Sequence, residues 1–146
     1  MAFDTETGAL HFDDGLVVGP SSTWSELEPR LELFSSHGEH RSLHGSASID
    51  GTRFSIVVWF RDEELERVSL TVDEPEISGT AWNDYDPETV RRFHDAWVTD
   101  RVGETTPWNT SRAPYGGIER DYRWGTIGSY LHPQDGAASM TITYGR

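Results

Sequence analysis

The chain has 146 residues, no cysteine and a formal net charge of −13. The lack of cysteine excludes disulfides, thiolate nucleophiles and cysteine-ligated metal sites. All twelve basic residues are arginines, which excludes Schiff-base lysines and the lysine of a phosphate-binding P-loop. The length fits one domain, which we expect to span residues 1–146.

The N-terminus has neither the basic region nor the apolar run of a signal peptide. No stretch approaches the roughly 20 apolar residues that cross a bilayer. The sequence therefore predicts a cytoplasmic protein without a membrane partner.

Negative charge is confined to two parts of the chain. Residues 1–40 carry −7 and residues 60–104 carry −8, whereas residues 41–59 and 105–146 each carry +1. Such a field repels nucleic acid and attracts a basic protein. Acidity also serves solubility, which is an alternative explanation.

The first predicted element is a short, irregular helix. Thr23 and Glu26 have the spacing of a capping box, in which each side chain satisfies a free backbone donor of the other. The apolar residues Trp24, Leu27, Leu31 and Phe34 follow at helical spacing. Pro29 falls inside this pattern and should break or kink the helix.

A series of β-hairpins is predicted next. Asp50-Gly51 is a strong two-residue turn signal and joins a strand near 42–49 to one at 53–60. The second strand is apolar on both faces at its centre, so we expect the sheet to be covered on both sides there. Residues 68–72 alternate between apolar and polar, which is typical of a half-buried strand.

The second helix is predicted over about 86–101. Asp86 suits the N-cap, Pro87 the first helical position and Gly103 the stop, and Val90, Phe93 and Trp97 form one apolar stripe. Residues 103–118 are predicted to be a long loop. One strand over Tyr122–Tyr130, a turn at Pro133–Gly136 and a strand at 138–144 should follow.

These elements predict an α+β fold. We expect an antiparallel β-sheet of about five to seven strands, built from hairpins, with two helices packed on it.

Three kinds of residue could carry chemistry, although no known catalytic motif is present and neither a catalytic residue nor a cofactor is predicted. His37, His40 and His44 are weak candidates for zinc ligands, and the alternative is a polar loop with solvated histidines. His94 could be a general base, or a histidine at the edge of the core that bonds a backbone carbonyl. The acidic pairs lie in predicted turns and caps and are interpreted as solvated.

Partner binding is the other role considered. Aromatic residues interleaved with arginine are typical of interfaces and occur in the C-terminal part, although Tyr122 and Trp124 also suit the core. The acids at the predicted turn and at the start of the second helix, including Glu88 and Asp95, suit a basic partner. The candidate partner-binding residues are Asp62, Glu63, Glu64, Asp84, Asp86, Trp108, Arg112 and Tyr115.

Five segments carry a resemblance to small bacterial proteins of unknown function. They are 54–68, Arg92–Trp97, Trp124–Tyr130, Pro133–Gly136 and Ile142–Tyr144, about half of the chain. That group has an Asp after the Tyr near the turn, where this chain has Leu131 and His132. Some proteins of this kind are thought to be immunity or accessory factors. The resemblance implies a fold and transfers no catalytic residue.

Two hypotheses follow. The first is a non-catalytic protein-binding domain, such as an acidic immunity or inhibitor protein for a basic partner, acting as a monomer or small homo-oligomer. The alternative is a small hydrolase or metal-binding enzyme that uses His94 or the cluster of His37, His40 and His44. A purely structural or accessory role is also compatible with the sequence.

Overall fold

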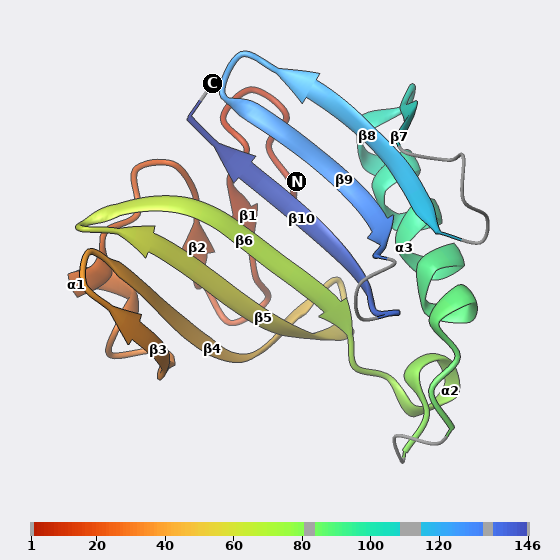
Figure 1. Ribbon diagram of the computed structural model, residues 1–146, viewed down its shortest axis with the longest axis horizontal. Coiled ribbons are helices and arrows are strands. Elements are labelled where there is room, and N and C mark those ends of the chain that lie inside the picture. Colours follow the sequence, from red (N-terminus) through yellow and green to blue (C-terminus); the bar gives the residue numbers. More distant parts are fainter. Residues whose placement is uncertain (1, 81–83, 109–114, 133–135, 146) are drawn as a thin grey trace.

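The computed structural model describes residues 2–80, 84–108, 115–132 and 136–145. Its main feature is an antiparallel sheet of eight strands in the order β3-β4-β5-β6-β10-β9-β8-β7 (Figure 1). These strands are β3 (Glu32–His37), β4 (His40–Ile49), β5 (Thr52–Arg61), β6 (Glu64–Val72), β7 (Thr106–Trp108), β8 (Gly116–Tyr122), β9 (Gly125–Leu131) and β10 (Ala138–Tyr144). A separate ribbon pairs β1 (Leu10–His11) with β2 (Val17–Val18), and the helices are α1 (Trp24–Leu27), α2 (Pro75–Ser78) and α3 (Pro87–Val102).

The predicted α+β class and the antiparallel, hairpin-built sheet are confirmed, but the predicted number of strands is too low. Strand β7 lies within 103–118, which the sequence pattern indicated to be a loop. The single strand predicted over Tyr122–Tyr130 is a hairpin of β8 and β9, because Arg123 and Trp124 form a turn between them. The turn predicted at 133–136 falls mostly outside the described residues.

The turn between β4 and β5 forms where the sequence predicts it. Asp50 and Gly51 both have positive φ, 50° and 81°, as a two-residue hairpin turn requires. The Asp13 carboxylate accepts hydrogen bonds from both of their backbone amides, at 2.9 and 2.8 Å. The N-terminal segment is thereby attached to the tip of this hairpin.

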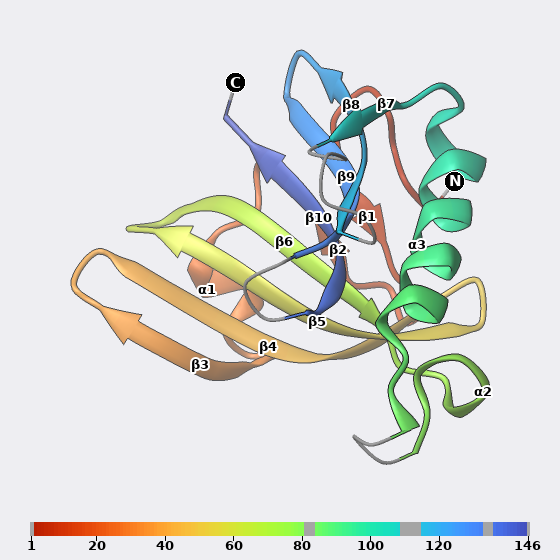
Figure 2. The same cartoon turned by 45° about the vertical axis from the view of Figure 1, so that its right-hand side comes forward.

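One face of the sheet carries the core. On β5, Phe54, Ile56, Val58 and Phe60 are at most 1% exposed, whereas the intervening residues are half-buried or exposed. Helix α3 and the β1–β2 ribbon lie on the same side of the sheet and cover this face (Figures 1 and 2). Strand β5 lies inside the sheet between β4 and β6, but the prediction that both of its faces are covered is wrong for the described part of the chain, in which all of these covering elements lie on one side.

Helix α3 is the best-predicted element. The Asp86 side chain accepts a hydrogen bond from the Glu88 amide, and Pro87 begins the helix. Gly103 ends it with a φ of 78°. Val90, His94, Trp97, Val98 and Val102 are its buried residues, and the helix packs on β6, β8, β9 and β10.

Helix α1 is shorter than its sequence pattern suggests. The predicted capping box is present: Thr23 accepts from the Glu26 amide, and Glu26 accepts from the Thr23 amide. The helix ends at Leu27, because Pro29 cannot continue it. The residues at helical spacing beyond it, Leu31 and Phe34, are not helical, and Phe34 lies in strand β3.

Candidate functional site

The face of the sheet opposite α3 holds a shallow groove, which we call the open-face groove. Its cavity volume is about 580 Å³. It crosses the sheet from β5 to β7, over residues far apart in the sequence. It is lined by Trp59, Arg67, Ser69, Thr71, Trp108, Tyr130, His132, Ala137, Ala138, Ser139, Thr141 and Thr143.

The floor of the groove is made of short hydroxyl side chains. Ser69 and Thr71 on β6 lie beside Ser139, Thr141 and Thr143 on β10. None of these hydroxyl groups forms a hydrogen bond with a residue in the described ranges. Because the floor residues are small, the larger aromatic side chains at either end stand above them.

Trp59 and Arg67 form one end of the groove. They are cross-strand partners on β5 and β6, and the Arg67 guanidinium carbon lies 4.1 Å from the centroid of the Trp59 ring. This cation–π contact orients both side chains. Arg67 makes no ion pair within the described part of the chain, whereas Arg61 on the same face pairs with Glu66 at 3.0 Å.

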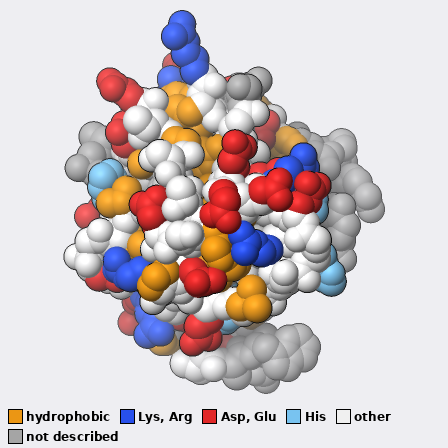
Figure 3. All heavy atoms as spheres, turned by 90° about the vertical axis from the view of Figure 1, so that its left-hand side faces the viewer, with side chains coloured by type: hydrophobic (Ala, Val, Ile, Leu, Met, Phe, Trp, Pro, Cys, Tyr) orange, Lys and Arg blue, Asp and Glu red, His pale blue; other side chains and the backbone are white. Residues whose placement is uncertain are grey.

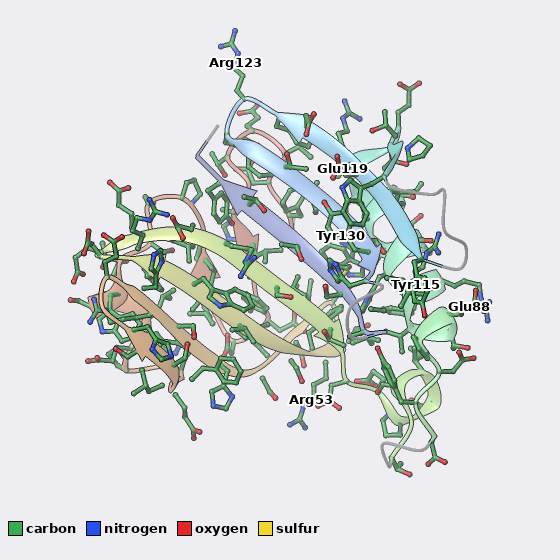
Figure 4. All side chains as sticks on the ribbon, in the orientation of Figure 1. Arg53, Glu88, Tyr115, Glu119, Arg123 and Tyr130 are labelled. Atoms are coloured by element: carbon green, nitrogen blue, oxygen red, sulfur yellow. The ribbon has the colours of Figure 1, made fainter. Side chains whose placement is uncertain are left out.

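Three rings form the other end. The Tyr130 ring lies 5.0 Å from that of Trp108 and 5.7 Å from that of His132, between centroids. The Tyr130 hydroxyl donates to the Glu119 carboxylate at 2.8 Å, and the two residues come from the adjacent strands β9 and β8 (Figure 4). Burial and the nearby Glu119 raise the pKa of Tyr130 far above its usual value. Tyr130 is therefore a fixed, neutral hydrogen-bond donor.

Gly128 makes room for Tyr130. A Cβ atom at Gly128 would collide with the Tyr130 ring and hydroxyl. The absence of a side chain at Gly128 allows the Tyr130 ring to pack over the backbone of its own strand. In this position the ring contacts Trp108.

The groove differs in charge from the rest of the surface. Its lining includes Arg67 and His132 but no carboxylate. A larger cavity, of about 780 Å³, lies elsewhere and is lined by Asp4, Glu6, Asp50 and Asp100 among others. Its cation, Arg101, is already paired with Asp50 at 3.4 Å. The carboxylates of this acidic cleft contribute to the negative field of the protein. The cleft is not the candidate binding site, because its lining has no Trp or Tyr.

The acids predicted at 62–64 do not line the groove but lie beyond its Trp59–Arg67 end: Asp62 and Glu63 are in the turn between β5 and β6, and Glu64 begins β6. The structure brings them beside the first acidic segment of the sequence: the Asp62 amide donates to the Glu39 carbonyl at 2.7 Å, and Thr23 and Glu64 form an isolated bridge. Glu63 pairs with Arg41 at 3.1 Å. Several acidic side chains and a few arginines are spread over this end of the molecule, among hydrophobic and uncharged side chains (Figure 3).

The acids predicted at 84–86 serve the start of α3. Asp86 caps the helix, and hydrogen bonds from Thr89 and the Glu88 amide hold the pKa of its carboxyl below the usual value. Asp84 lies against Gly79 in the preceding segment. These acids and those at 62–64 are on different parts of the molecule and do not form one surface.

The other candidate binding residues do not lie together either. Trp108 lines the groove, and Tyr115 is partly buried against the core. Arg112 lies outside the described residues. The Trp124 indole nitrogen donates to the Thr5 carbonyl at 2.9 Å, and its ring stacks on Tyr122, so both residues hold the N-terminal segment in place.

His94 is a structural residue. Its side chain is fully buried, and its Nε2 accepts a hydrogen bond from the Val72 amide at 3.0 Å. Since the predicted partner was a carbonyl, the direction of this bond differs from expectation. Nε2 is occupied, so Nδ1 carries the proton, and it has no partner within the described residues. Burial lowers the pKa of His94 to about 4. Because its side chain is not accessible to solvent, His94 cannot act as a general base on a bound substrate.

The three histidines predicted as weak metal ligands lie on the β3–β4 hairpin rather than in a loop. His37 pairs with His40 across the turn, and the His44 Nε2 is 3.8 Å from a Glu32 carboxylate oxygen. Across the described residues, no group of three or more His, Asp or Glu side chains is arranged to hold a metal ion.

Most residues of the groove were not predicted from the sequence. Trp59, Arg67, Tyr130 and His132 were not predicted as site residues. The available signal was the repetition of hydroxyl residues at alternate positions of two strands, 69 and 71, and 139, 141 and 143. Alternation predicts a shared face but not which strands become neighbours.

Comparison with protein-family models, curated proteins and solved structures finds no match to this chain. None of the described helices has the length and apolar character needed to cross a membrane.

Proposed function

We propose that this chain is a non-catalytic protein-binding domain of the inhibitor or immunity type, which docks a basic partner on its open-face groove. The observation that carries the proposal is the side-chain content of the groove. Trp, Tyr and Arg dominate the binding energy of protein interfaces, and Trp59, Arg67, Trp108 and Tyr130 stand at the two ends of one uncovered sheet face.

The surrounding charge supports a basic partner. The net charge is −13, the groove lining holds no carboxylate, and acids gather outside it, among other places at the β5–β6 turn and in the acidic cleft. Complementary long-range fields accelerate encounter and disfavour wrong partners, while buried aromatic and arginine anchors set the dissociation rate. Steering and anchoring are thus assigned to different residues.

The enzyme hypothesis gains no support from a specific contact. His94 is buried with its Nε2 bonded to a backbone amide, and the Tyr130 hydroxyl is held in its neutral form. No described side chain in the groove has the geometry of an activated nucleophile with an adjacent base.

Truncation of the groove aromatics should remove partner binding. We expect Trp59→Ala and Trp108→Ala each to weaken the affinity for the partner by about 30-fold or more, the effect typical of an interface hot spot. The tagged chain would be used to capture its partner from native host lysate, and affinities of the purified pair would be measured by calorimetry. Phe34→Ala is the matched control, because Phe34 is an aromatic residue 59% exposed on β3 and outside the groove.

Neutralising Asp62, Glu63 and Glu64 together should act differently. The association rate and its salt dependence should fall, with the dissociation rate almost unchanged. Undiminished capture of the same protein by both tryptophan variants would contradict the docking face. Capture of no specific protein by the folded chain at low salt would contradict the protein-binding function itself.

A further inference from the structure

Arginines stacked on aromatic rings recur across the described part of the chain. The pairs are Arg41 on Trp24, Arg67 on Trp59, Arg101 on Trp97 and Arg120 on Tyr122. Stacking engages the face of the planar guanidinium group, whereas its N–H donors lie in the plane and point outward at its edge. A stacked arginine therefore keeps an edge that can bind an oxygen acceptor.

Arg67 differs from the other three stacked arginines in this respect. Their acceptors are the Glu63 carboxylate for Arg41, the Trp97 carbonyl for Arg101 and the Val102 carbonyl for Arg120. Arg67 has no oxygen acceptor among the residues that the structure describes, although its side chain is exposed and oriented by Trp59. Its guanidinium is thus held in place with its donor edge unmatched in the described ranges.

The acids on either side of the groove are bonded to other residues. Glu66, which precedes Arg67 in the chain, pairs with Arg61 at 3.0 Å. Glu119, at the aromatic end, accepts the Tyr130 hydroxyl hydrogen bond at 2.8 Å. The lining itself holds no carboxylate. Within the described residues, the chain therefore supplies no oxyanion for Arg67.

The groove floor next to Arg67 offers further donors. Thr143 faces Arg67 in the ladder of β6 and β10, and Thr141 faces Ser69 one step further along. Hydroxyl groups can donate as well as accept hydrogen bonds. A guanidinium edge matches the two oxygens of a carboxylate with parallel hydrogen bonds. A carboxylate on this edge would lie above hydroxyl groups, with no like charge in the lining.

We propose that the partner places a carboxylate side chain, Asp or Glu, on the edge of the Arg67 guanidinium, within a surface that is otherwise basic. The pairing rests on the proposed function and specifies the chemistry of the partner at one end of the groove. The net charge of −13 repels a free anion, most strongly one with several charges such as phosphate. A carboxylate set among the lysines and arginines of a basic protein is instead attracted with the whole surface.

This pairing also gives the groove selectivity among basic proteins. A partner that is basic throughout would place a cation against Arg67, and such a like-charge contact disfavours binding. The acidic surface outside the groove and the cationic groove end thus require a mixed partner, with an acidic residue inside a basic surface.

Two matched peptides test the inference on the full chain. They are acetyl-Lys-Lys-Gly-Glu-Gly-Lys-Lys-amide and the same peptide with Gln in place of Glu. The Gln peptide carries one positive charge more, so the negative field of the protein alone favours it. We expect the Glu peptide to bind about threefold more tightly, because it alone pairs with Arg67. Titration of the isotopically labelled chain at low salt, followed by NMR, should show the largest shifts on β6 and β10.

Arg67→Gln should reverse this order, so that the Gln peptide binds more tightly. The matched control is Arg123→Gln, which removes the same charge from the exposed turn between β8 and β9 and should leave the order unchanged (Figure 4). A Gln peptide preferred by the wild type would overturn the inference, as would a preference for the Glu peptide that survives in Arg67→Gln. Inorganic phosphate that shifts the same signals at a lower concentration would also overturn it, since the ligand would then be a free anion.

The captured partner provides the second measurement. Arg67→Gln should weaken its affinity about fivefold or more, mainly through faster dissociation, and Arg123→Gln should not. Unchanged affinity in Arg67→Gln, with affinity lost in Trp108→Ala, would overturn the carboxylate pairing and leave the docking face intact. Capture of no partner would contradict the proposed function, and the peptide titration would still decide whether Arg67 takes a carboxylate.

Discussion

Lowering the pH from 7 to 4 is expected to reduce the free energy of unfolding by about 3 kcal/mol through His94 alone. The folded-state pKa of His94 is about 4, below its ordinary value of 6.5. The folded protein therefore holds the neutral ring, while the unfolded chain takes up a proton at higher pH. The stabilisation is complete above about pH 6.5 and is lost as the pH falls towards 4.

The position of His94 explains the size of this effect. Val72 is the last residue of β6, and the pairing of β6 with β10 ends at Leu70. The His94 Nε2 accepts the Val72 amide hydrogen in place of a strand partner. Protonation of Nε2 would remove that acceptor and bury a charge that has no carboxylate beside it.

Urea unfolding of the wild type and of His94→Gln at pH 7, 6, 5 and 4 would measure this contribution. A glutamine amide oxygen can accept the Val72 hydrogen bond and does not titrate. The difference in unfolding free energy between the two proteins should therefore change by about 3 kcal/mol over this range, while the carboxylates contribute equally to both. A difference that stays constant with pH would show that His94 keeps an ordinary pKa in the folded protein.

Gly8→Ala is expected to destabilise the fold by about 3 kcal/mol. Gly8 has a φ of 82°, and a Cβ there would lie 2.6–2.7 Å from the Trp124 ring. The Gly8 carbonyl also accepts a hydrogen bond from the Tyr144 hydroxyl at 2.7 Å. The substitution thus combines backbone strain with a collision at the point where the two ends of the chain meet.

Gly15→Ala is a matched control for the backbone term. Gly15 has a similar φ of 92°, but a Cβ there meets no atom within 4 Å, so only about 1 kcal/mol of strain is expected. Thermal unfolding of both variants at one pH would give the difference, which is the cost of displacing Trp124. Equal destabilisation by the two variants would show that displacing Trp124 costs no free energy, and that the contact between Gly8 and Trp124 does not stabilise the fold.

Both predictions concern the elements that cover one face of the sheet. The covered face of the sheet depends on α3, which His94 fastens to β6, and on the N-terminal segment, which Gly8 and Trp124 fasten to β10. Because both covers lie on one side, they leave uncovered the opposite face, which carries Trp59, Arg67, Trp108 and Tyr130, as far as the described residues extend.

Features set by neighbouring residues were determined by the sequence itself. The Asp50-Gly51 turn, the capping box of Thr23 and Glu26 and the start of α3 at Asp86 and Pro87 all form as predicted. Each depends on backbone conformations and hydrogen bonds within a few residues, so composition at those positions is sufficient. The antiparallel α+β class follows from the order of such elements.

Only the tertiary structure decided which surface is free. Trp59 lies on a strand that is apolar on both faces, and whether a face is covered depends on residues 3–18 and 87–102, not on the strand. Likewise, Leu31–Phe34 has helical spacing, but Pro29 ends α1 and pairing with β4 makes Phe34 part of an edge strand. The groove joins residues 59 to 143 because strand order places β6 next to β10, and long-range pairing of this kind has no local signature in the sequence.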